Sequence, residues 1–299
     1  MVKHILVPLD GSNLAESALP AAAYLAEKLH ARVTLLHVIE ENAPKEIHGE
    51  RHLTNPEEAL SYLKGLAGSH FQSGIKVETH VHKEEVQNVA KSIVSHSQDE
   101  FAPDLIVLSA HGHGGLRDIF MGNIAQQVLS AGQIPVLLLD VPESGCRECF
   151  EVKTILLPLD GNPQHEQAFS SGQQLAEACQ AGVILLVVIP TLTSLKGEKA
   201  ATGIFLPGAV NIALEQAEEE AGSYVAEHMQ LLDKAGVNAT SVIVRGDPAG
   251  QIAEAAQAAN VDLIILGTHK KSGSDAFWSA SVASKVSSLS QKPILFVPV

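Results

Sequence analysis

Short, continuous apolar runs alternate with amphipathic segments along the chain. In the first half, the runs that predict strands are Ile5–Pro8, Val33–Val38, Lys76–Val81, Leu105–Leu108 and Val136–Leu139. The segments between them predict helices at Leu14–Leu29, Pro56–Gln72, Glu85–Ser97 and Ile124–Ala131. In the first of these, apolar residues recur at helical spacing, at Leu14, Ala18, Ala22, Leu25 and Leu29. Runs that are apolar throughout are typical of parallel strands covered on both faces, so this half predicts a five-stranded, doubly wound parallel sheet.

The second half of the chain repeats this pattern. Three segments have a counterpart: Val2–Ser12 with Val152–Asn162, Asp104–His111 with Asp262–His269, and Ile134–Leu139 with Lys292–Val297. The runs that predict its strands are Ile155–Pro158, Val183–Ile189, Thr240–Val244, Leu263–Leu266 and Ile294–Val297. A period of about 150 residues indicates a duplicated domain, because the repeats of solenoids are much shorter. The sequence therefore predicts two similar α/β domains, residues 1–141 and 152–299, joined by a linker at 142–151.

Length, charge and cysteine content narrow the class of protein. A chain of 299 residues suits two domains, and its apolar runs fall far short of the roughly 20 residues that span a bilayer. The sequence enters a strand directly after Met1 with no signal-peptide layout. The net charge of −14 disfavours nucleic acid or an anionic membrane as a partner, and three cysteines do not make a disulfide framework. We therefore expect a cytoplasmic protein.

A glycine-rich segment, Ser109–Asn123, follows the fourth predicted strand and leads into the predicted helix Ile124–Ala131. A buried strand, a glycine-rich loop and a helix start, in that order, are typical of phosphate-binding sites. The glycines let backbone N–H groups approach an anion, and the helix start offers unpaired donors. The segment carries His111, Gly112, His113, Gly114, Gly115 and Gly122. The two histidines are candidates for donating to a phosphate or binding a metal.

An acidic turn, Pro8–Ser12, follows the first predicted strand. In a doubly wound sheet, ligands bind outside the carboxyl ends of the strands, where the winding direction reverses. If the first and fourth strands are neighbours at that point, Asp10 faces the glycine-rich segment across one cleft. A carboxylate there suits ribose hydroxyls or a base amino group. The alternative is that Asp-Gly-Ser is only a turn and a helix cap.

On these motifs the sequence resembles the tandem universal stress proteins. The family opens with a V-P-x-D-G-S turn, seen at Val7–Ser12 and in altered form at Leu157–Asn162. Its ATP-binding members carry G-x2-G-x9-G-[S/T] after the fourth strand, a spacing that falls here on Ser109, Gly112, Gly122 and Asn123. The resemblance implies a Rossmann-like, adenine nucleotide alpha hydrolase-like fold that binds ATP, with or without Mg²⁺, or AMP. The site residues it implies are Pro8, Asp10, Val38, His111, Gly112, Gly114, Gly115, Gly122, Asn123 and Ile124.

The second half departs from that motif. The same spacing falls on Gly267, Lys270, Ala280 and Ser281, so side chains stand where the backbone must approach phosphate. Lys270 and Lys271 can still attract phosphate by charge. We therefore expect nucleotide mainly in the first domain, with a degenerate second domain. The sequence has no Walker-type lysine and no evident pair of catalytic carboxylates, which predicts a binding protein with at most slow ATP hydrolysis. The resemblance implies a role in stress response or signalling.

Two alternative functions, other than nucleotide binding, are also compatible with the sequence. One is a metal- or thiol-dependent sensor, in which Cys146 and Cys149 combine with histidines to hold zinc. Pairs that can each supply two ligands are His48 with His52 and His80 with His82. The other reading is an interaction scaffold that binds no ligand.

Two further expectations concern the long insertions and the last strands. Glu40–Thr54 and Pro190–Gly208 follow the second strand of each half, and loops of this length are usually functional lids or disordered. We expect nucleotide to order the first of them. The family resemblance implies that the last strands pair antiparallel about a pseudo-twofold axis, here Val136–Leu139 with Ile294–Val297. This pairing would make the chain an internal dimer and would cover edges that are otherwise exposed. A homodimer of the whole chain is a further possibility.

Overall fold

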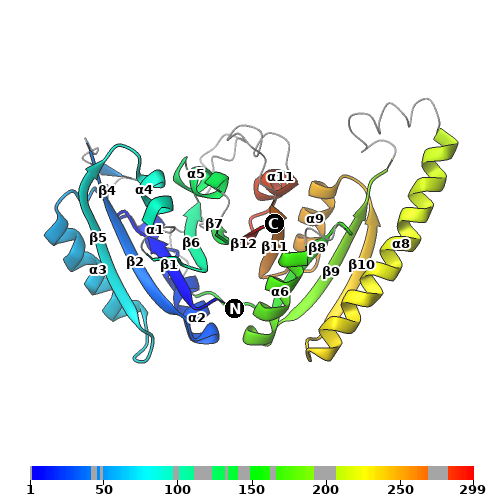
Figure 1. Cartoon of the computed structure of the whole chain (residues 1–299), viewed down its shortest axis with the longest axis horizontal. Coiled ribbons are helices and arrows are strands. Elements are labelled where there is room, and N and C mark those ends of the chain that lie inside the picture. The colour runs from blue at the N-terminus through cyan, green and yellow to red at the C-terminus, as the bar shows by residue number, and fades with distance from the viewer. Residues whose placement is uncertain are drawn as a thin grey trace. The chain divides into compact units, whose positions relative to one another are not determined.

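The apolar runs form strands, and most of the amphipathic segments form helices, in a computed structural model of the chain (Figure 1). The structure describes residues 2–41, 46–47, 50–96, 101–110, 123–131, 134–140, 149–161, 166–191, 207–268 and 282–299. The contacts between residues divide the chain into two compact units. Unit 1 is Met1–Glu151 together with Pro293–Pro298, and unit 2 is Val152–Lys292 together with Val299. No helix in the described parts is both long and apolar enough to cross a membrane.

Unit 1 is built on a parallel sheet with the predicted topology. Its elements are β1 (His4–Pro8), α1 (Asn13–Glu16), α2 (Leu19–Leu29), β2 (Arg32–Glu40), β3 (Glu46–Ile47), β4 (Glu50–Arg51), α3 (Pro56–His70), β5 (Val77–Val86), α4 (Val89–Ser95), β6 (Leu105–Ala110), α5 (Asn123–Ala131), β7 (Val136–Asp140) and β12 (Ile294–Pro298). The strand order is β12-β7-β6-β1-β2-β5. All neighbours from β7 to β5 run parallel, and the winding direction reverses between β1 and β6.

Unit 2 repeats this arrangement. Its elements are β8 (Thr154–Leu159), α6 (Glu166–Cys179), β9 (Gly182–Ile189), α8 (Pro207–Lys234), β10 (Ala239–Arg245), α9 (Pro248–Ala258), β11 (Leu263–Thr268) and α11 (Val282–Leu289). The strand order is β10-β9-β8-β11, with every pair parallel. Strand β8 therefore corresponds to β1, and its neighbours β9 and β11 correspond to β2 and β6. The predicted fold class, two tandem doubly wound α/β domains, is confirmed.

The central strands are buried because helices cover both faces of each sheet. Ile5, Leu6 and Val7 of β1 are fully buried, as are Ile155, Leu156 and Leu157 of β8. This explains why these strands read as continuous apolar runs rather than as an alternation.

One carboxylate fixes the start of the central strand in each unit. Asp104 Oδ2 accepts the backbone N–H groups of Lys3–His4, at 2.7 and 3.0 Å. Asp262 Oδ2 does the same for Lys153–Thr154, at 2.9 Å for both. The duplication therefore reaches individual hydrogen bonds.

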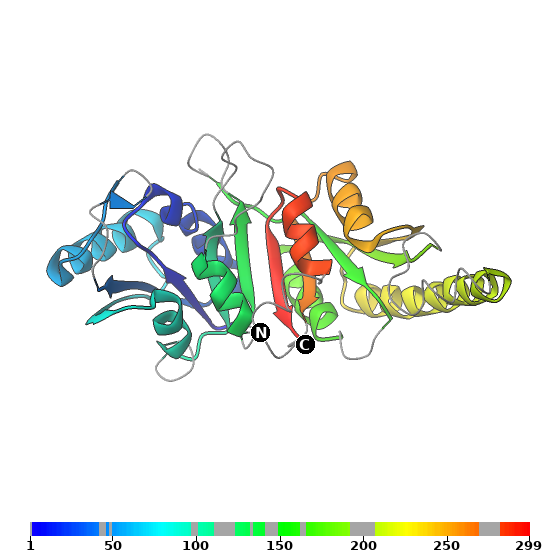
Figure 2. The same cartoon turned by 90° about the horizontal axis from the view of Figure 1, so that it is seen from above.

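The last strand of the chain joins unit 1. Strand β12 pairs antiparallel with β7, with Ile294 opposite Leu138 and Phe296 opposite Val136 (Figure 2). The two segments predicted to pair therefore do pair, in the predicted direction. The internal dimer and its pseudo-twofold axis remain predictions.

Two helix boundaries differ from the sequence prediction. The single helix expected over Leu14–Leu29 is two helices, α1 and α2. Pro20 stands in the first turn of α2, and its ring nitrogen has no proton to donate into a continuous helix. The helix expected over Glu85–Ser97 begins only at Val89, because β5 continues to Val86 and Asn88 caps α4 by accepting the Lys91 N–H at 2.8 Å.

Candidate nucleotide-binding site

The turn after β1 uses one of the two Asp10 oxygens to hold its own shape. Asp10 Oδ1 accepts the backbone N–H of Ser12 at 3.0 Å and its hydroxyl at 2.6 Å. The Ser12 hydroxyl in turn accepts the N–H of Ala15 at 3.2 Å and caps α1. Among the described residues, Oδ2 of Asp10 has no hydrogen-bond partner. The turn and cap role is therefore real, and it leaves the second carboxylate oxygen for another group.

Gly11 lets the chain pass closely under a residue of the insertion that follows β2. Its φ of +94° is a conformation that L side chains rarely adopt. A Cβ at this position would lie 2.9 Å from both Cγ and Cδ1 of Leu53. Leu53 therefore packs directly on the backbone of the Asp10 turn, so the predicted lid ends beside the predicted site.

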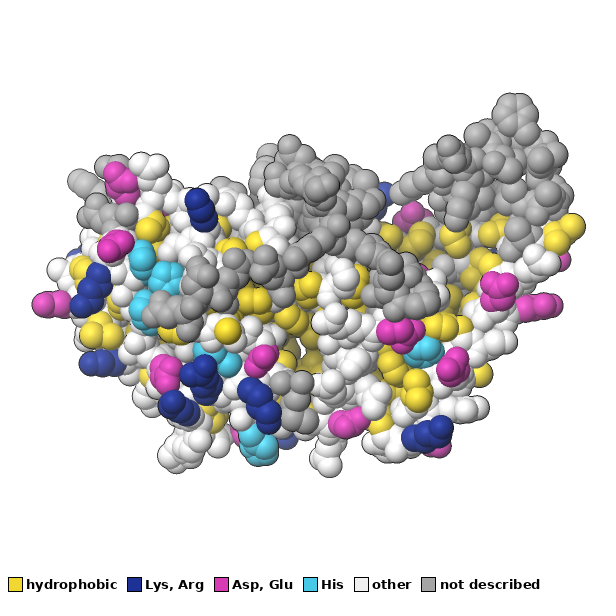
Figure 3. Space-filling model, viewed as in Figure 1, with side chains coloured by type: hydrophobic (Ala, Val, Ile, Leu, Met, Phe, Trp, Pro, Cys, Tyr) yellow, Lys and Arg dark blue, Asp and Glu magenta, His cyan; other side chains and the backbone are white. Residues whose placement is uncertain are grey.

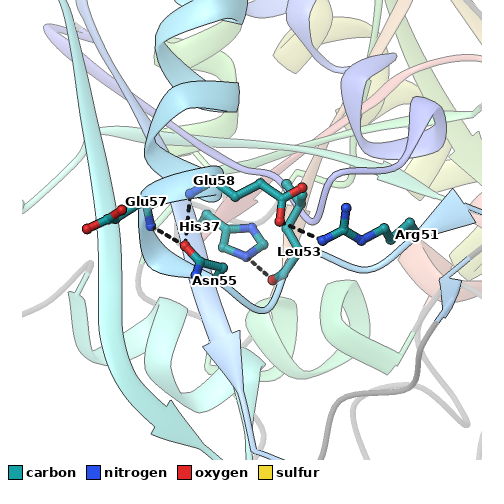
Figure 4. A network of polar contacts seen from close by, with 6 residues as sticks. All are labelled: His37, Arg51, Leu53, Asn55, Glu57 and Glu58. Atoms are coloured by element: carbon teal, nitrogen blue, oxygen red, sulfur yellow. Dashed lines mark hydrogen bonds and ion pairs between the residues drawn. The ribbon is translucent and has the colours of Figure 1, made fainter.

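His37 ties the end of the insertion to the same turn (Figure 4). Its ring is 1% exposed, with Nδ1 2.8 Å from the Leu9 carbonyl oxygen and Nε2 2.9 Å from that of Leu53. Asn55 then caps α3 by accepting the N–H groups of Glu57–Glu58, at 2.8 and 3.1 Å. The sequence analysis missed His37. The available signal was a single histidine within the mostly apolar run Val33–Val38.

The ends of β1 and β6 lie next to each other, as the cleft hypothesis requires. The two strands are parallel neighbours through Ile5 and Leu6. Beyond them, the hydroxyl of Ser109, at the end of β6, lies 2.8 Å from the hydroxyl of Ser17, just after α1. The first residue of the glycine-rich segment thus sits close to the helix that the Asp10 turn begins.

The other predicted site residues divide into described and undescribed ones. Pro8 ends β1, Val38 lies on β2 with 5% exposed, and Ile124 is half-buried in α5. Asn123 is the first residue of α5. The remaining predicted positions, His111, Gly112, Gly114, Gly115 and Gly122, lie outside the described residues. Their place around a ligand stays a prediction.

The equivalent turn of unit 2 also has a glycine at positive φ, and no described residue packs against it. Gly161 also has a positive φ, +73°, yet a Cβ there would meet nothing within 4 Å among the described residues. Asp160 is exposed. The departures from the motif at Lys270 and Ala280 lie outside the described part of the chain.

Of the histidine pairs, one can be assessed in full. His80 and His82 lie together on β5, and His96, which the sequence analysis did not single out, joins them from the end of α4. For the other pair, His48 lies outside the described residues, and His52 is buried with 5% exposed. Of the predicted thiol pair, Cys149 is exposed and Cys146 is not described.

The comparisons with known proteins identify the family. The sequence model of the universal stress protein family matches residues 1–140 and again residues 151–298. The chain therefore belongs to the universal stress protein family, in a tandem arrangement. A universal stress protein of Mycolicibacterium smegmatis is 24% identical over 315 residues, which cover 98% of this chain and 96% of the relative. Universal stress protein YxiE of Bacillus subtilis is 27% identical over 150 residues, or 46% of this chain and 99% of the relative.

Solved structures share the fold over both halves. A putative universal stress protein from Pseudomonas aeruginosa UCBPP-PA14 matches with a TM-score of 0.70 at 16% identity, covering 99% of this chain and 93% of that chain. A universal stress protein from Archaeoglobus fulgidus matches with a TM-score of 0.66 at 16% identity, covering 98% and 95%. At these identities the likeness concerns the fold alone.

Proposed function

We propose that unit 1 binds an adenine nucleotide, ATP or AMP, outside the carboxyl ends of β1 and β6, and that this binding serves stress response or signalling. The observation that carries the proposal is Oδ2 of Asp10, which has no hydrogen-bond partner among the described residues and lies in a hydrogen-bonded turn at the point where the sheet reverses its winding. A carboxylate oxygen there suits the hydroxyls of a ribose. The glycine-rich segment after Ser109 supplies backbone N–H groups for phosphate.

In this proposal unit 2 supports or regulates rather than binds. Its motif has Lys270 and Ala280 where the backbone must approach phosphate. Its turn also lacks the packing that Leu53 gives to Gly11 in the described residues. The two units thus differ in the sequence of the phosphate segment and, among the described residues, in what packs against the turn opposite it.

A matched pair of substitutions tests the proposal. Asp10→Asn keeps an oxygen that can accept both Ser12 bonds, so the turn survives, but the charge and one acceptor oxygen are lost. Losing a charge-assisted hydrogen bond costs about 1.5–3 kcal/mol, so we expect roughly 10- to 150-fold weaker binding of ATP or AMP. Asp160→Asn, at the equivalent turn of unit 2, should leave the affinity unchanged. Isothermal titration calorimetry gives both numbers.

Mass spectrometry of small molecules released from the purified protein provides an independent readout. We expect an adenine nucleotide from the wild type and less of it from the Asp10→Asn variant. The proposal fails if no nucleotide is released and neither ATP nor AMP changes the melting temperature. It also fails if Asp160→Asn weakens binding as much as Asp10→Asn does.

A further inference from the structure

We propose that His80, His82 and His96 form a binding site for a divalent transition-metal ion, with Zn²⁺ as the expected occupant. One ring nitrogen of each lies within 4.8 Å of the others. Histidine side chains gather at one place on the surface of unit 1, shown in cyan in Figure 3. The site shares no residue with the proposed nucleotide site and does not depend on it.

Two secondary-structure elements bring the three rings together. His80 and His82 are two residues apart on β5, so they share one face of the strand, while Val81 between them is buried with 9% exposed. His96 is the C-cap residue of α4, where its backbone N–H bonds to the last carbonyls of that helix. A metal here would join the edge strand β5 to α4.

The hydrogen bonds of His96 direct a lone pair at its neighbour. Its Nδ1 lies 2.9 Å from the backbone carbonyl oxygen of Ser92, and a carbonyl can only accept, so the proton is on Nδ1. In the neutral ring Nε2 therefore carries the lone pair, and it lies 3.1 Å from Nδ1 of His82. A ring whose other nitrogen donates to a backbone carbonyl is the usual arrangement of a metal-ligating histidine.

The nitrogen spacing suits a tetrahedral ion. Two nitrogens bound at about 2.0–2.1 Å in tetrahedral geometry are about 3.3 Å apart. The 3.1 Å between His82 and His96 is already near this value. In the metal-free protein the proton between them occupies the position that the ion would take. The widest gap in the cluster, at most 4.8 Å, needs to close by about 1.5 Å, a small rotation for the half-buried His80 ring.

Aromatic packing orients the rings without supplying a competing ligand. Phe101 stacks on His96 with ring centroids 5.9 Å apart and meets the edge of His80 at 5.0 Å. His96 is 8% exposed, which limits the number of positions that water can reach around it. A site in which three imidazoles bind the ion and water takes the fourth position would be exchangeable rather than closed and structural. Imidazole ligands suit Zn²⁺, Cu²⁺ and Ni²⁺, and disfavour Mg²⁺ and Ca²⁺.

The test is a Zn²⁺ titration of the chelator-stripped full chain against a chromophoric competitor. We expect one equivalent of Zn²⁺ per chain, and Co²⁺ in its place should give the visible absorption of a four- or five-coordinate ion. His80→Gln and His82→Gln should each weaken Zn²⁺ binding at least tenfold. His70→Gln, at an exposed histidine of α3, is the matched control and should bind as the wild type does.

Controls separate metal loss from misfolding and from the thiols. His80 and His82 are only half-buried, so circular dichroism and melting of their glutamine variants should match those of the stripped wild type. A Cys146→Ser, Cys149→Ser double variant should keep the Zn²⁺ affinity. The proposal is overturned if the wild type binds no Zn²⁺, if both histidine variants bind as tightly as the wild type, or if the affinity disappears with the cysteines.

Discussion

Replacing Gly11 by alanine should destabilise unit 1 more than the same change at Gly161 destabilises unit 2. Both glycines have a positive φ, +94° and +73°, and an L residue in this region costs about 1–2 kcal/mol. At Gly11 the new Cβ also lies 2.9 Å from Cγ and Cδ1 of Leu53. Moving Leu53 weakens the contact of its backbone carbonyl oxygen with His37 Nε2, worth about 1 kcal/mol as a hydrogen bond. We therefore expect about 2–3 kcal/mol for Gly11→Ala and about 1–2 kcal/mol for Gly161→Ala.

Hydrogen exchange of the full chain, measured by mass spectrometry on its peptides, gives the stability of each unit separately. Since 1.4 kcal/mol is a factor of ten, the expected losses correspond to roughly 30- to 140-fold faster exchange around β1 and β2 in Gly11→Ala. In Gly161→Ala they correspond to roughly 5- to 30-fold faster exchange around β8 and β9. Peptides of the unchanged unit serve as the internal reference in each variant.

A double-mutant cycle with Leu53→Ala isolates the contact. Alanine at position 53 removes Cγ and Cδ1, the two atoms that the new Cβ would meet, and leaves the backbone strain in place. The penalty of Gly11→Ala should therefore fall by about 1 kcal/mol in the Leu53→Ala background. Equal effects at Gly11 and Gly161, or no coupling with Leu53, would refute the packing of the insertion on the Asp10 turn.

Two further predictions concern the central strands. Burial lowers the pKa of His4, with the Arg32 charge as a second cause, so protons bind the unfolded chain more tightly. The stability it contributes is present above the unfolded pKa of about 6.5 and is lost as the pH falls toward the folded pKa. Urea midpoints at pH 7.5 and 5.5 should therefore differ more in the wild type than in His4→Gln; an equal drop contradicts this. Asp104→Ala and Asp262→Ala each leave two backbone N–H groups without their acceptor, so each should lower the free energy of unfolding of its own unit by about 2 kcal/mol. A loss in one unit but not in the other, again by hydrogen exchange, would show that the duplicated anchors are not equivalent.

The fold was predictable because the same pattern of apolar runs occurs in both halves of the chain. Apolar runs such as Leu105–Leu108 and Leu263–Leu266 match in both halves, so each supports the assignment of the other. Helix boundaries were harder, since α4 begins only where Asn88 caps it, and residues before that point continue β5. The spacing of apolar residues alone does not show that a strand continues beyond its apolar residues, as β5 does up to Val86.

The site was predictable only where local chemistry marks it. Asp10, Gly11 and Ser12 form a turn that any sequence with this spacing favours. The contact of Leu53 with Gly11 and the meeting of His96 with β5 join residues far apart in the chain. The periodicity of apolar residues does not predict such contacts, because they depend on where an irregular segment folds back and on which residue ends a helix.

The pairing of β12 with β7 has a consequence for synthesis on the ribosome. Unit 1 contains β12, so it stays incomplete until the chain has been translated through Pro298. At 5–20 residues per second, the roughly 150 residues after β7 take on the order of 10–30 s. During that interval β7 presents an apolar edge with no partner of its own. Two nascent chains on one messenger can then exchange their β12 strands, so a domain-swapped dimer is the assembly error that this pairing favours.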